Sequence, residues 1–198
     1  MASKVLLREW IALETKPGLI KESREQNGGK LILQGVIQRA EMKNQNKRIY
    51  PRGILMREVE NYQKAVRENR AVGELDHPES STVSLKNVSH VIREMRWDGD
   101  TVIGRIEVLP TPQGKILESI IDSGVTIGIS SRGVGSTEKT NEGCDMVQHD
   151  FQLICFDIVS EPSTPGAYLF SEGKQYSTDI RFNKADRIYR ALNDIVRK

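Results

Sequence analysis

The sequence predicts an α+β fold built on an antiparallel sheet or a small barrel. Many short runs have the composition of strands, only a few segments have helical spacing, and Gly or Pro turn signals separate them. The chain has 198 residues, 37% of them hydrophobic, which is enough for one domain with a core and a small appendage.

The first predicted elements are a strand and a helix. Residues 31–37 follow an Asn-Gly-Gly turn signal at 27–29 and are predicted to form a strand. Pro51 suits the first turn of a helix, and apolar residues then recur at helical spacing to about Asn69.

A hairpin and a second helix are predicted next. Residues 88–96 and 101–109 lie on either side of an Asp-Gly-Asp turn, which predicts two antiparallel strands. Residues 115–122 predict a short helix that ends at Gly124, because glycine readily adopts the left-handed conformation that terminates helices.

Two strands and a C-terminal helix complete the prediction. Residues 125–132 and 151–159 are predicted strands. Residues 180–198 carry an apolar stripe at helical spacing, which predicts an amphipathic helix. Asn183 would be its N-cap, with Asp186 three residues later.

Composition excludes several classes of protein. The 29 Lys and Arg nearly balance the 27 Asp and Glu, so the net charge of +2 does not favour general nucleic-acid binding. No apolar run reaches the ~18–20 residues of a membrane span, and no signal-peptide pattern is present at the N-terminus. Cys144 and Cys155 form neither a disulfide framework nor a zinc motif. We therefore expect a soluble intracellular protein without a metal or cofactor.

Three histidines are available for proton transfer near neutral pH: His77, His90 and His149. His77 lies in Gly-Glu-Leu-Asp-His-Pro, where the proline fixes the local backbone. His90 lies within a predicted strand, and we expect His149 to face solvent at the start of another. A loop histidine beside a turn proline is the alternative interpretation for His77.

A serine in a glycine-rich strand is the candidate nucleophile. The sequence Gly-Ile-Ser-Ser-Arg-Gly at 128–133 surrounds Ser130 with small residues, so a substrate carbonyl could approach and backbone N–H groups could face an oxyanion. Arg132 stands where Gly-x-Ser-x-Gly requires its second glycine, which excludes the nucleophile-elbow hydrolases. A serine-rich strand leading into a glycine turn explains the pattern equally well.

Asp157 is a carboxylate within an otherwise apolar predicted strand, where burial without a partner is costly. An imidazole would be a suitable partner, and a salt bridge to Arg or Lys is the alternative. Together with His77 and Ser130, this aspartate would supply the nucleophile, base and orienting group of acyl transfer.

Four motifs, in this order, resemble the prohead (capsid maturation) proteases of tailed bacteriophages of the myovirus type. They are Asn-Lys-Arg-Ile-Tyr-Pro at 46–51, Gly-Glu-Leu-Asp-His-Pro at 73–78, Gly-Ile-Ser-Ser-Arg-Gly at 128–133 and Asp-Ile-Val-Ser-Glu-Pro-Ser-Thr-Pro-Gly-Ala at 157–167. That family is similar in fold to herpesvirus assemblins, which implies a small antiparallel β-barrel core surrounded by helices. The resemblance also implies an N-terminal extension (1–30), a protease domain (31–170) and a C-terminal tail with the amphipathic helix (171–198).

The same resemblance assigns roles to three residues. It makes His77 the general base, Ser130 the nucleophile and Asp157 the third member of a catalytic triad. Assemblins use a second histidine as third member, so His149 is the rival of Asp157. Ser131 is the rival nucleophile, but side chains alternate along a strand, and a glycine two residues ahead favours Ser130.

The oxyanion donor is assigned by a departure from the assemblin pattern. Assemblins place an arginine pair after the third triad strand, whereas this chain has Ser-Thr-Pro-Gly at 163–166. The backbone N–H of Gly166 is therefore the candidate donor.

The resemblance implies a serine endopeptidase that cuts after Glu during phage capsid maturation. Its substrates would be the scaffold or core proteins, the major capsid protein and the enzyme itself. It would act as a homo-oligomer inside the immature phage head, in the host cytoplasm, without nucleic acid or membrane. One alternative is a non-catalytic core or scaffold protein that docks through its C-terminal helix. Another is a nucleic-acid-binding module that uses Lys43–Arg48 and the basic 181–198 segment.

In the family that the chain resembles, cleavage follows a Glu that has Leu or Ile two or three positions before it and a small residue after it, and two sites in this chain fit that pattern. Glu22 precedes Ser23, and Glu172 precedes Gly173. Both lie near Pro-Gly breakers and outside the motif-bearing core, where we expect extended chain that can enter an active site.

Overall fold

The computed structural model describes residues 5–13, 17–125, 127–141, 143–160 and 169–171. The helices in these ranges are α1 (Pro17–Gln26), α2 (Arg52–Arg67) and α3 (Pro112–Asp122). The strands are β1 (Val5–Leu13), β2 (Ile32–Arg39), β3 (Arg48–Ile49), β4 (Val72–Glu74), β5 (Val88–Asp98), β6 (Thr101–Val108), β7 (Ile127–Gly135), β8 (Thr137–Lys139), β9 (Asp145–Val147), β10 (Gln152–Val159) and β11 (Leu169–Ser171).

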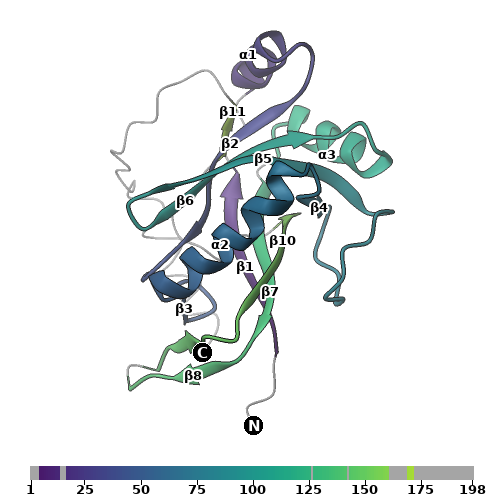
Figure 1. Cartoon of the computed structure of the whole chain (residues 1–198). Helices are drawn as coiled ribbons and strands as arrows, with labels where there is room; N and C mark the ends of the chain where they lie inside the picture. Colours follow the sequence, from purple (N-terminus) through teal and green to yellow (C-terminus); the bar gives the residue numbers. More distant parts are fainter. Residues whose placement is uncertain (1–4, 14–16, 126, 142, 161–168, 172–198) are drawn as a thin grey trace, which may run out of the picture.

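The strands form three sheets, in the orders β11-β2-β6-β5-β4, β1-β7-β10 and β3-β9-β8. The pairs within the sheets are antiparallel except β3–β9, which is parallel. Figure 1 shows α2 lying across the strands, between β5 and β10. The α+β class is therefore confirmed. No closed barrel is detected among the described strands, so the assemblin-like barrel stays a prediction.

The elements expected from the sequence between residues 31 and 159 are present, with small shifts at their ends. The hairpin β5–β6 turns at Gly99, whose φ of 58° is the left-handed conformation that the Asp-Gly signal predicts. Helix α3 begins at Pro112, earlier than predicted, because the side chain of Thr111 caps it by accepting the N–H of Gly114 at 3.0 Å. The predicted helix at 180–198, with Asn183 and Asp186, lies outside the described residues.

The N-terminal segment contributes to the sheet that contains Ser130, which the sequence pattern did not indicate. Strand β1 pairs with β7 along its whole length, from Val5 opposite Gly135 to Leu13 opposite Ile127. Residues 1–30 therefore supply a strand and helix α1, although we expected only an extension; the domain boundaries stay a prediction.

A shared hydrophobic core joins the helices to the sheets. Helix α2 buries one face at helical spacing, through Leu55, Val59, Tyr62 and Val66. The Tyr62 ring packs edge-on against Phe156 of β10, with the ring centroids 5.7 Å apart. This contact fixes β10 beneath α2.

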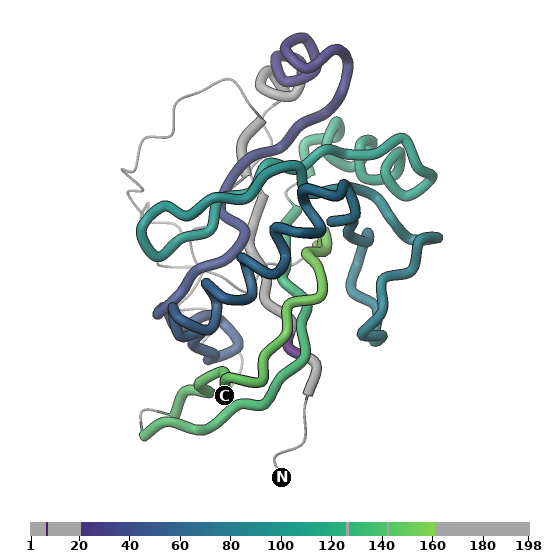
Figure 2. The backbone as a smooth tube through the Cα atoms, in the orientation of Figure 1, coloured from purple at the N-terminus to yellow at the C-terminus, as the bar shows by residue number. Residues whose placement is uncertain are grey.

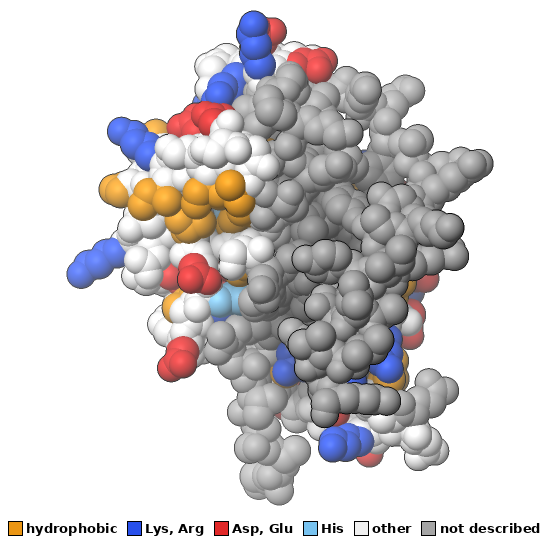
Figure 3. Space-filling view, turned by 180° about the vertical axis from the view of Figure 1, so that it is seen from behind, with side chains coloured by type: hydrophobic (Ala, Val, Ile, Leu, Met, Phe, Trp, Pro, Cys, Tyr) orange, Lys and Arg blue, Asp and Glu red, His pale blue; other side chains and the backbone are white. Residues whose placement is uncertain are grey.

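Strands β7 and β10 are connected through the β8–β9 hairpin. Figure 2 follows β7 into the β8–β9 hairpin at the bottom of the view and back through β10. Seen from the opposite side, hydrophobic side chains gather in a patch on the left of the view, with Lys, Arg, Asp and Glu side chains nearby (Figure 3). No helix in the described part of the chain is long and apolar enough to cross a membrane.

Candidate active site

Two candidate residues face each other across the β7–β10 pair. Ser130 and Asp157 are direct partners in the antiparallel register, so their side chains lie on the same face of the sheet. Both residues are fully buried. The register alone therefore brings together two residues that lie 27 positions apart in the sequence.

The loop after β4 brings His77 to this pair. The N–H of Asp76 donates to the carbonyl of Ile158 at 2.7 Å, and Leu75 forms an isolated bridge with the same residue. Gly73 allows the close approach of β4, because a Cβ there would lie 1.9 Å from the carbonyl oxygen of Phe156. The loop is thus attached to the residues on either side of Asp157.

His77 bridges the serine and the aspartate. Its Nε2 lies 2.6 Å from Oγ of Ser130, and its Nδ1 lies 2.8 Å from Oδ2 of Asp157. A carboxylate can only accept, so Nδ1 carries the proton and Nε2 is left to accept from the serine hydroxyl. The imidazole is therefore in the tautomer that can take a proton from Ser130.

The surroundings of Asp157 keep it ionised. Burial would raise the pKa of this carboxyl, but the hydrogen bond with His77, the charge of Arg132 and the N–H of Glu74 together lower the pKa below its ordinary value. The Glu74 N–H donates to Oδ1 at 3.0 Å. Both oxygens of Asp157 are thus engaged by donors.

The rival residues lie elsewhere. Ser131 faces the other side of β7, where its Oγ accepts from the side-chain amide of Gln38 at 2.8 Å. His149 is exposed in the turn before β10 and lines a hollow of about 450 Å³ beside α2. The structure therefore brings Ser130, and not Ser131, to His77.

His90 is a buried neutral histidine. Burial lowers its pKa to about 4, so the ring is uncharged near neutral pH. Its Nε2 donates to the carbonyl of Phe156 at 3.0 Å, and its Nδ1 accepts from the hydroxyl of Ser89 at 2.9 Å. It supports the backbone next to Asp157 without contacting Ser130 Oγ.

Of the predicted oxyanion donor and the two predicted cleavage sites, the structure describes only one cleavage site. Gly166 and Glu172 lie outside the described residues. Glu22 lies inside α1, and the next residue, Ser23, is fully buried with its hydroxyl donating to the carbonyl of Ile32 at 2.7 Å. The expectation of extended chain at Glu22 is therefore wrong, because Ser23 anchors the helix to β2.

Sequence reasoning missed two charged residues beside the triad. Arg132 appeared only as the residue that breaks Gly-x-Ser-x-Gly, and Glu74 only as part of the histidine motif. In the structure their side chains form a fully buried ion pair at 2.8 Å. An arginine inside a buried strand was the available signal, because a buried guanidinium requires partners.

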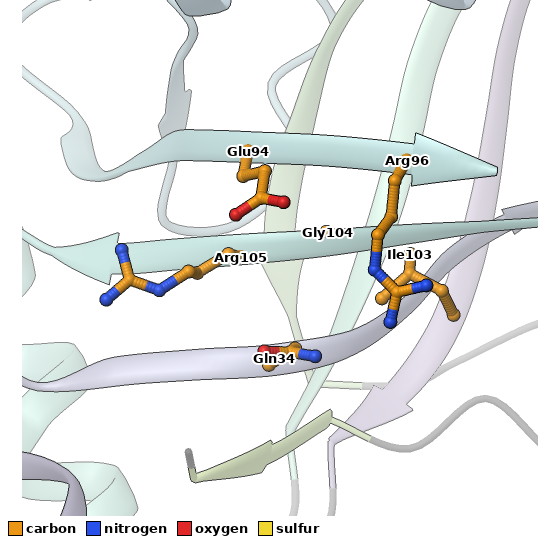
Figure 4. A pocket seen from close by; sticks show the side chains of 6 residues that line it. All are labelled: Gln34, Glu94, Arg96, Ile103, Gly104 and Arg105. Atoms are coloured by element: carbon orange, nitrogen blue, oxygen red, sulfur yellow. The ribbon is translucent and has the colours of Figure 1, made fainter. Parts of the chain in front are cut away.

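Other surface features do not compete with this site. Figure 4 shows a small hollow on the five-stranded sheet, between β2, β5 and β6, lined by Gln34, Glu94, Arg96, Ile103, Gly104 and Arg105. It contains neither serine nor histidine. Among the residues that the structure describes, no cluster of His, Cys, Asp or Glu is arranged to hold a metal ion.

Comparisons with known proteins show what the chain is similar to. The family described as prohead core protein serine protease matches residues 12–177. The prohead core protein protease of Enterobacteria phage T4 is 36% identical over 173 residues, covering 85% of this chain and 82% of that protein. The solved structure of the bacteriophage T4 capsid assembly protease, gp21, superimposes with a TM-score of 0.68 at 32% identity, covering 79% of this chain and 98% of that chain.

Proposed function

The chain belongs to the family of prohead core protein serine proteases, and from this premise we propose that Ser130, His77 and Asp157 are its catalytic triad. The observation that carries the proposal is the 2.6 Å contact between Nε2 of His77 and Oγ of Ser130, in the tautomer required for proton transfer. The family membership makes the chain a serine protease of capsid assembly; the residue roles are our assignment.

Acylation begins with the hydroxyl of Ser130. Its oxygen attacks the scissile carbonyl carbon while its proton moves to Nε2 of His77, and the new C–O bond gives a tetrahedral oxyanion. The intermediate collapses as the C–N bond breaks, and His77 returns the proton to the leaving amine. Asp157 stabilises the imidazolium that forms between these steps and holds the tautomer that starts the cycle.

Deacylation repeats the same proton transfers with water. His77 takes a proton from water, whose oxygen attacks the acyl-enzyme ester, and then returns the proton to Oγ of Ser130 as the ester bond breaks. The product is a peptide with a new C-terminal carboxyl group, and the enzyme is regenerated. The backbone N–H of Gly166 is our candidate for binding the oxyanion.

For the substrates, we propose prohead core or scaffold proteins and the major capsid protein, cut after Glu inside the immature head by a homo-oligomer. The T4 relative is named as a prohead core protein protease, which supports the substrate class. The alternative, a non-catalytic core protein, would not require a serine hydroxyl hydrogen-bonded to an imidazole in the tautomer that can accept its proton.

A fluorophosphonate probe tests the nucleophile. We expect it to label the intact chain at Ser130, and we expect the Ser130→Ala variant to be unlabelled while its thermal melt is unchanged. Ser131→Ala is the matched control, since it removes the neighbouring hydroxyl from the other face of β7, and it should be labelled. If Ser131→Ala is unlabelled and Ser130→Ala is labelled, the assignment is wrong. If neither wild type nor Ser131→Ala is labelled, the scaffold interpretation stands.

We also propose self-cleavage after Glu172 and, more slowly, after Glu22. The Glu22 bond lies in α1 next to the anchored Ser23, so α1 must open before that bond can enter an active site. Intact-mass analysis over time should show fragments ending at these residues, the Glu172 product first. Ser130→Ala should stay whole, and Glu172→Gln should lose only the Glu172 product. A wild-type chain that stays whole while it cuts a core protein would rule out self-cleavage.

A further inference from the structure

Two charged side chains, Arg132 and Glu74, form a buried cluster with Asp157, the third member of the proposed triad. Arg132, Glu74 and Asp157 each have side chains with 0% exposure. Nη2 of Arg132 lies 2.8 Å from Oε1 of Glu74 and 3.2 Å from Oδ1 of Asp157, and its Nε lies 2.8 Å from Oδ2 of Asp157. The guanidinium thus contacts both oxygens of the carboxylate that also binds His77.

The remaining donors of Arg132 extend to the loop that carries His77. Nη1 donates to the carbonyl of Ser80 at 2.7 Å, with the carbonyl of Thr82 at 3.4 Å. All three guanidinium nitrogens therefore have an acceptor. Because the arginine belongs to β7, it ties the strand of the nucleophile to the loop of the base.

Glu74 fastens the other end of that loop. Its Oε1 also accepts the backbone N–H of Ser84 at 2.9 Å, and its Oε2 accepts from the side-chain amide of Asn87 at 3.1 Å. Its own N–H donates to Asp157. His77 is therefore carried by a loop whose start and end are both bound to this cluster.

Resting on the proposed function, we propose that Arg132, together with Glu74, is a positioning residue of the catalytic site. Arg132 holds Asp157 as an ionised acceptor toward His77 and holds the loop of His77 over Ser130. Neither Arg132 nor Glu74 is within hydrogen-bonding distance of Ser130 Oγ in the described contacts, so both act through Asp157 and the loop.

The cluster carries a net negative charge beside the proposed base. Two carboxylates and one guanidinium leave a net charge of −1 beside a neutral His77. The proton that His77 takes from Ser130 would neutralise that charge. In a buried site this electrostatic match is strong, because little water screens it.

Removing Arg132 should change the pKa of Asp157 in a direction that can be measured. Burial raises the pKa of Asp157, and the hydrogen bond with His77 and the charge of Arg132 lower it, so loss of the guanidinium shifts the pKa of Asp157 upward. Burial also raises the pKa of the Cys155 thiol, which stays protonated and donates to Oδ1 at 3.4 Å. The titratable or charged groups that act on Asp157 from the surrounding elements are Arg132, His77, Glu74, Cys155, His90 and Tyr62.

The test is the pH dependence of Ser130 labelling by a fluorophosphonate, in the intact chain and three variants. In Arg132→Met we expect labelling to slow about 10²-fold, since a displaced base loses its geometry. The acid limb, which is the fall of the labelling rate at low pH, should move to higher pH, because loss of the adjacent guanidinium raises the pKa of Asp157. Arg132→Lys keeps the positive charge but loses the planar guanidinium, which donates to several acceptors at once. Its acid limb should therefore stay near that of the wild type, while its labelling rate above the acid limb falls.

Glu74→Gln is the matched control, because it removes a negative charge from the cluster where Arg132→Met removes a positive one. It leaves the whole charge of Arg132 to Asp157, so its acid limb should not move to higher pH. A merely structural role would instead lower every rate in proportion to the folded fraction, measured by circular dichroism, and leave all acid limbs in place.

The outcomes separate this inference from the proposed function. If the wild-type chain is not labelled at Ser130, the triad itself fails. If the wild type is labelled but folded Arg132→Met keeps the wild-type acid limb, the positioning role of Arg132 is wrong. If Arg132→Met does not fold, the Arg132→Lys and Glu74→Gln profiles decide: an upward shift in both, or in Glu74→Gln alone, overturns the proposal.

Discussion

The centre of the five-stranded sheet and the three-stranded sheet β1-β7-β10 bury different kinds of side chain. The five-stranded sheet buries aliphatic residues such as Ile92, Val102 and Ile106, and it also buries polar Glu74 in β4 and Ser89 and His90 at the start of β5. The three-stranded sheet also buries Ser130, Arg132 and Asp157 at 0% exposure. The aliphatic part of the five-stranded sheet is held by non-directional burial, whereas the buried polar groups of the β1-β7-β10 sheet depend on specific partners.

This difference predicts where substitutions act. A polar group that is buried without its partner costs free energy, and here the partners are also the groups proposed to move protons. We therefore expect changes of the buried polar groups in the β1-β7-β10 sheet to reduce activity more than stability, and changes of the buried aliphatic residues in the five-stranded sheet to do the reverse. The predictions below run from the largest expected effect to the smallest.

Asp157→Asn should have the largest effect on turnover. The amide can present its NH₂ group to His77 and so favour the wrong tautomer, and we expect turnover to fall on the order of 10²–10⁴-fold. The variant keeps the size of the side chain, so its melting temperature should change little. Steady-state cleavage of a core protein, with melting curves in parallel, measures both; a fully active Asp157→Asn beside an inactive His149→Ala would make His149 the third member.

Ile106→Ala is the matching change in the five-stranded sheet. Truncation of this fully buried residue leaves a cavity and should lower the free energy of unfolding by about 2–5 kcal/mol. Turnover per folded molecule should stay near the wild-type value, because Ile106 belongs to β6, outside the three-stranded sheet. Urea titration gives the stability, and active-site titration with the fluorophosphonate gives the folded, reactive fraction. A selective loss of turnover here would remove the distinction between the sheets.

The sequence indicated more of the proposed triad than of the residues that hold it in place. Ser130, His77 and Asp157 were accessible because the motifs around them follow one another in a recognisable order. Their contact also follows from local rules: a strand register for Ser130 and Asp157, and a short loop for His77. The choice of Ser130 over Ser131 used the alternation of side chains along the strand together with the glycine two residues ahead, at 128.

The rest depended on contacts between distant segments. Arg132 has acceptors in β4, in the loop after it and in β10, and no spacing in the sequence reveals such a set. Glu22 has the correct residues around it for cleavage, yet Ser23 bonds to Ile32 and fixes it in a helix. Strand β1 becomes a strand by pairing with β7, which the pattern of residues 1–30 did not indicate.

His90, a buried residue of β5, allows a prediction of how the stability of the protein depends on pH. Burial lowers the pKa of His90 to about 4, whereas in the unfolded chain its value is near 6.5. The unfolded state therefore binds the proton first, and stability is lost as the pH falls from about 6.5 to about 4, by up to about 3 kcal/mol. His90→Gln should lack this loss. Urea titrations of both proteins from pH 7 to pH 4.5 give the slopes; parallel slopes would show that His90 does not titrate in this window.

Asp76 gives the smallest and most local comparison. It has a φ of 70°, and Asn69 at the end of α2 has a φ of 56°, so both are left-handed residues without being glycine. Alanine at either position should cost about 1–2 kcal/mol, since its Cβ is strained there and no side-chain oxygen compensates. Only Asp76 is next to the triad, where its Oδ1 accepts the backbone N–H of His77 at 2.8 Å.

The two alanine variants should therefore match in stability and differ in reactivity. We expect Asp76→Ala to slow fluorophosphonate labelling several-fold, because the His77 backbone loses an acceptor, whereas Asn69→Ala should label at the wild-type rate. Asp76→Asn, which keeps both the acceptor and the tolerance for this backbone conformation, should restore the rate. Asp76→Gly should recover stability but not the full rate, since it relieves the strain without replacing the oxygen. If Asp76→Gly restores both, backbone conformation alone orients His77 and the carboxylate has no part in it.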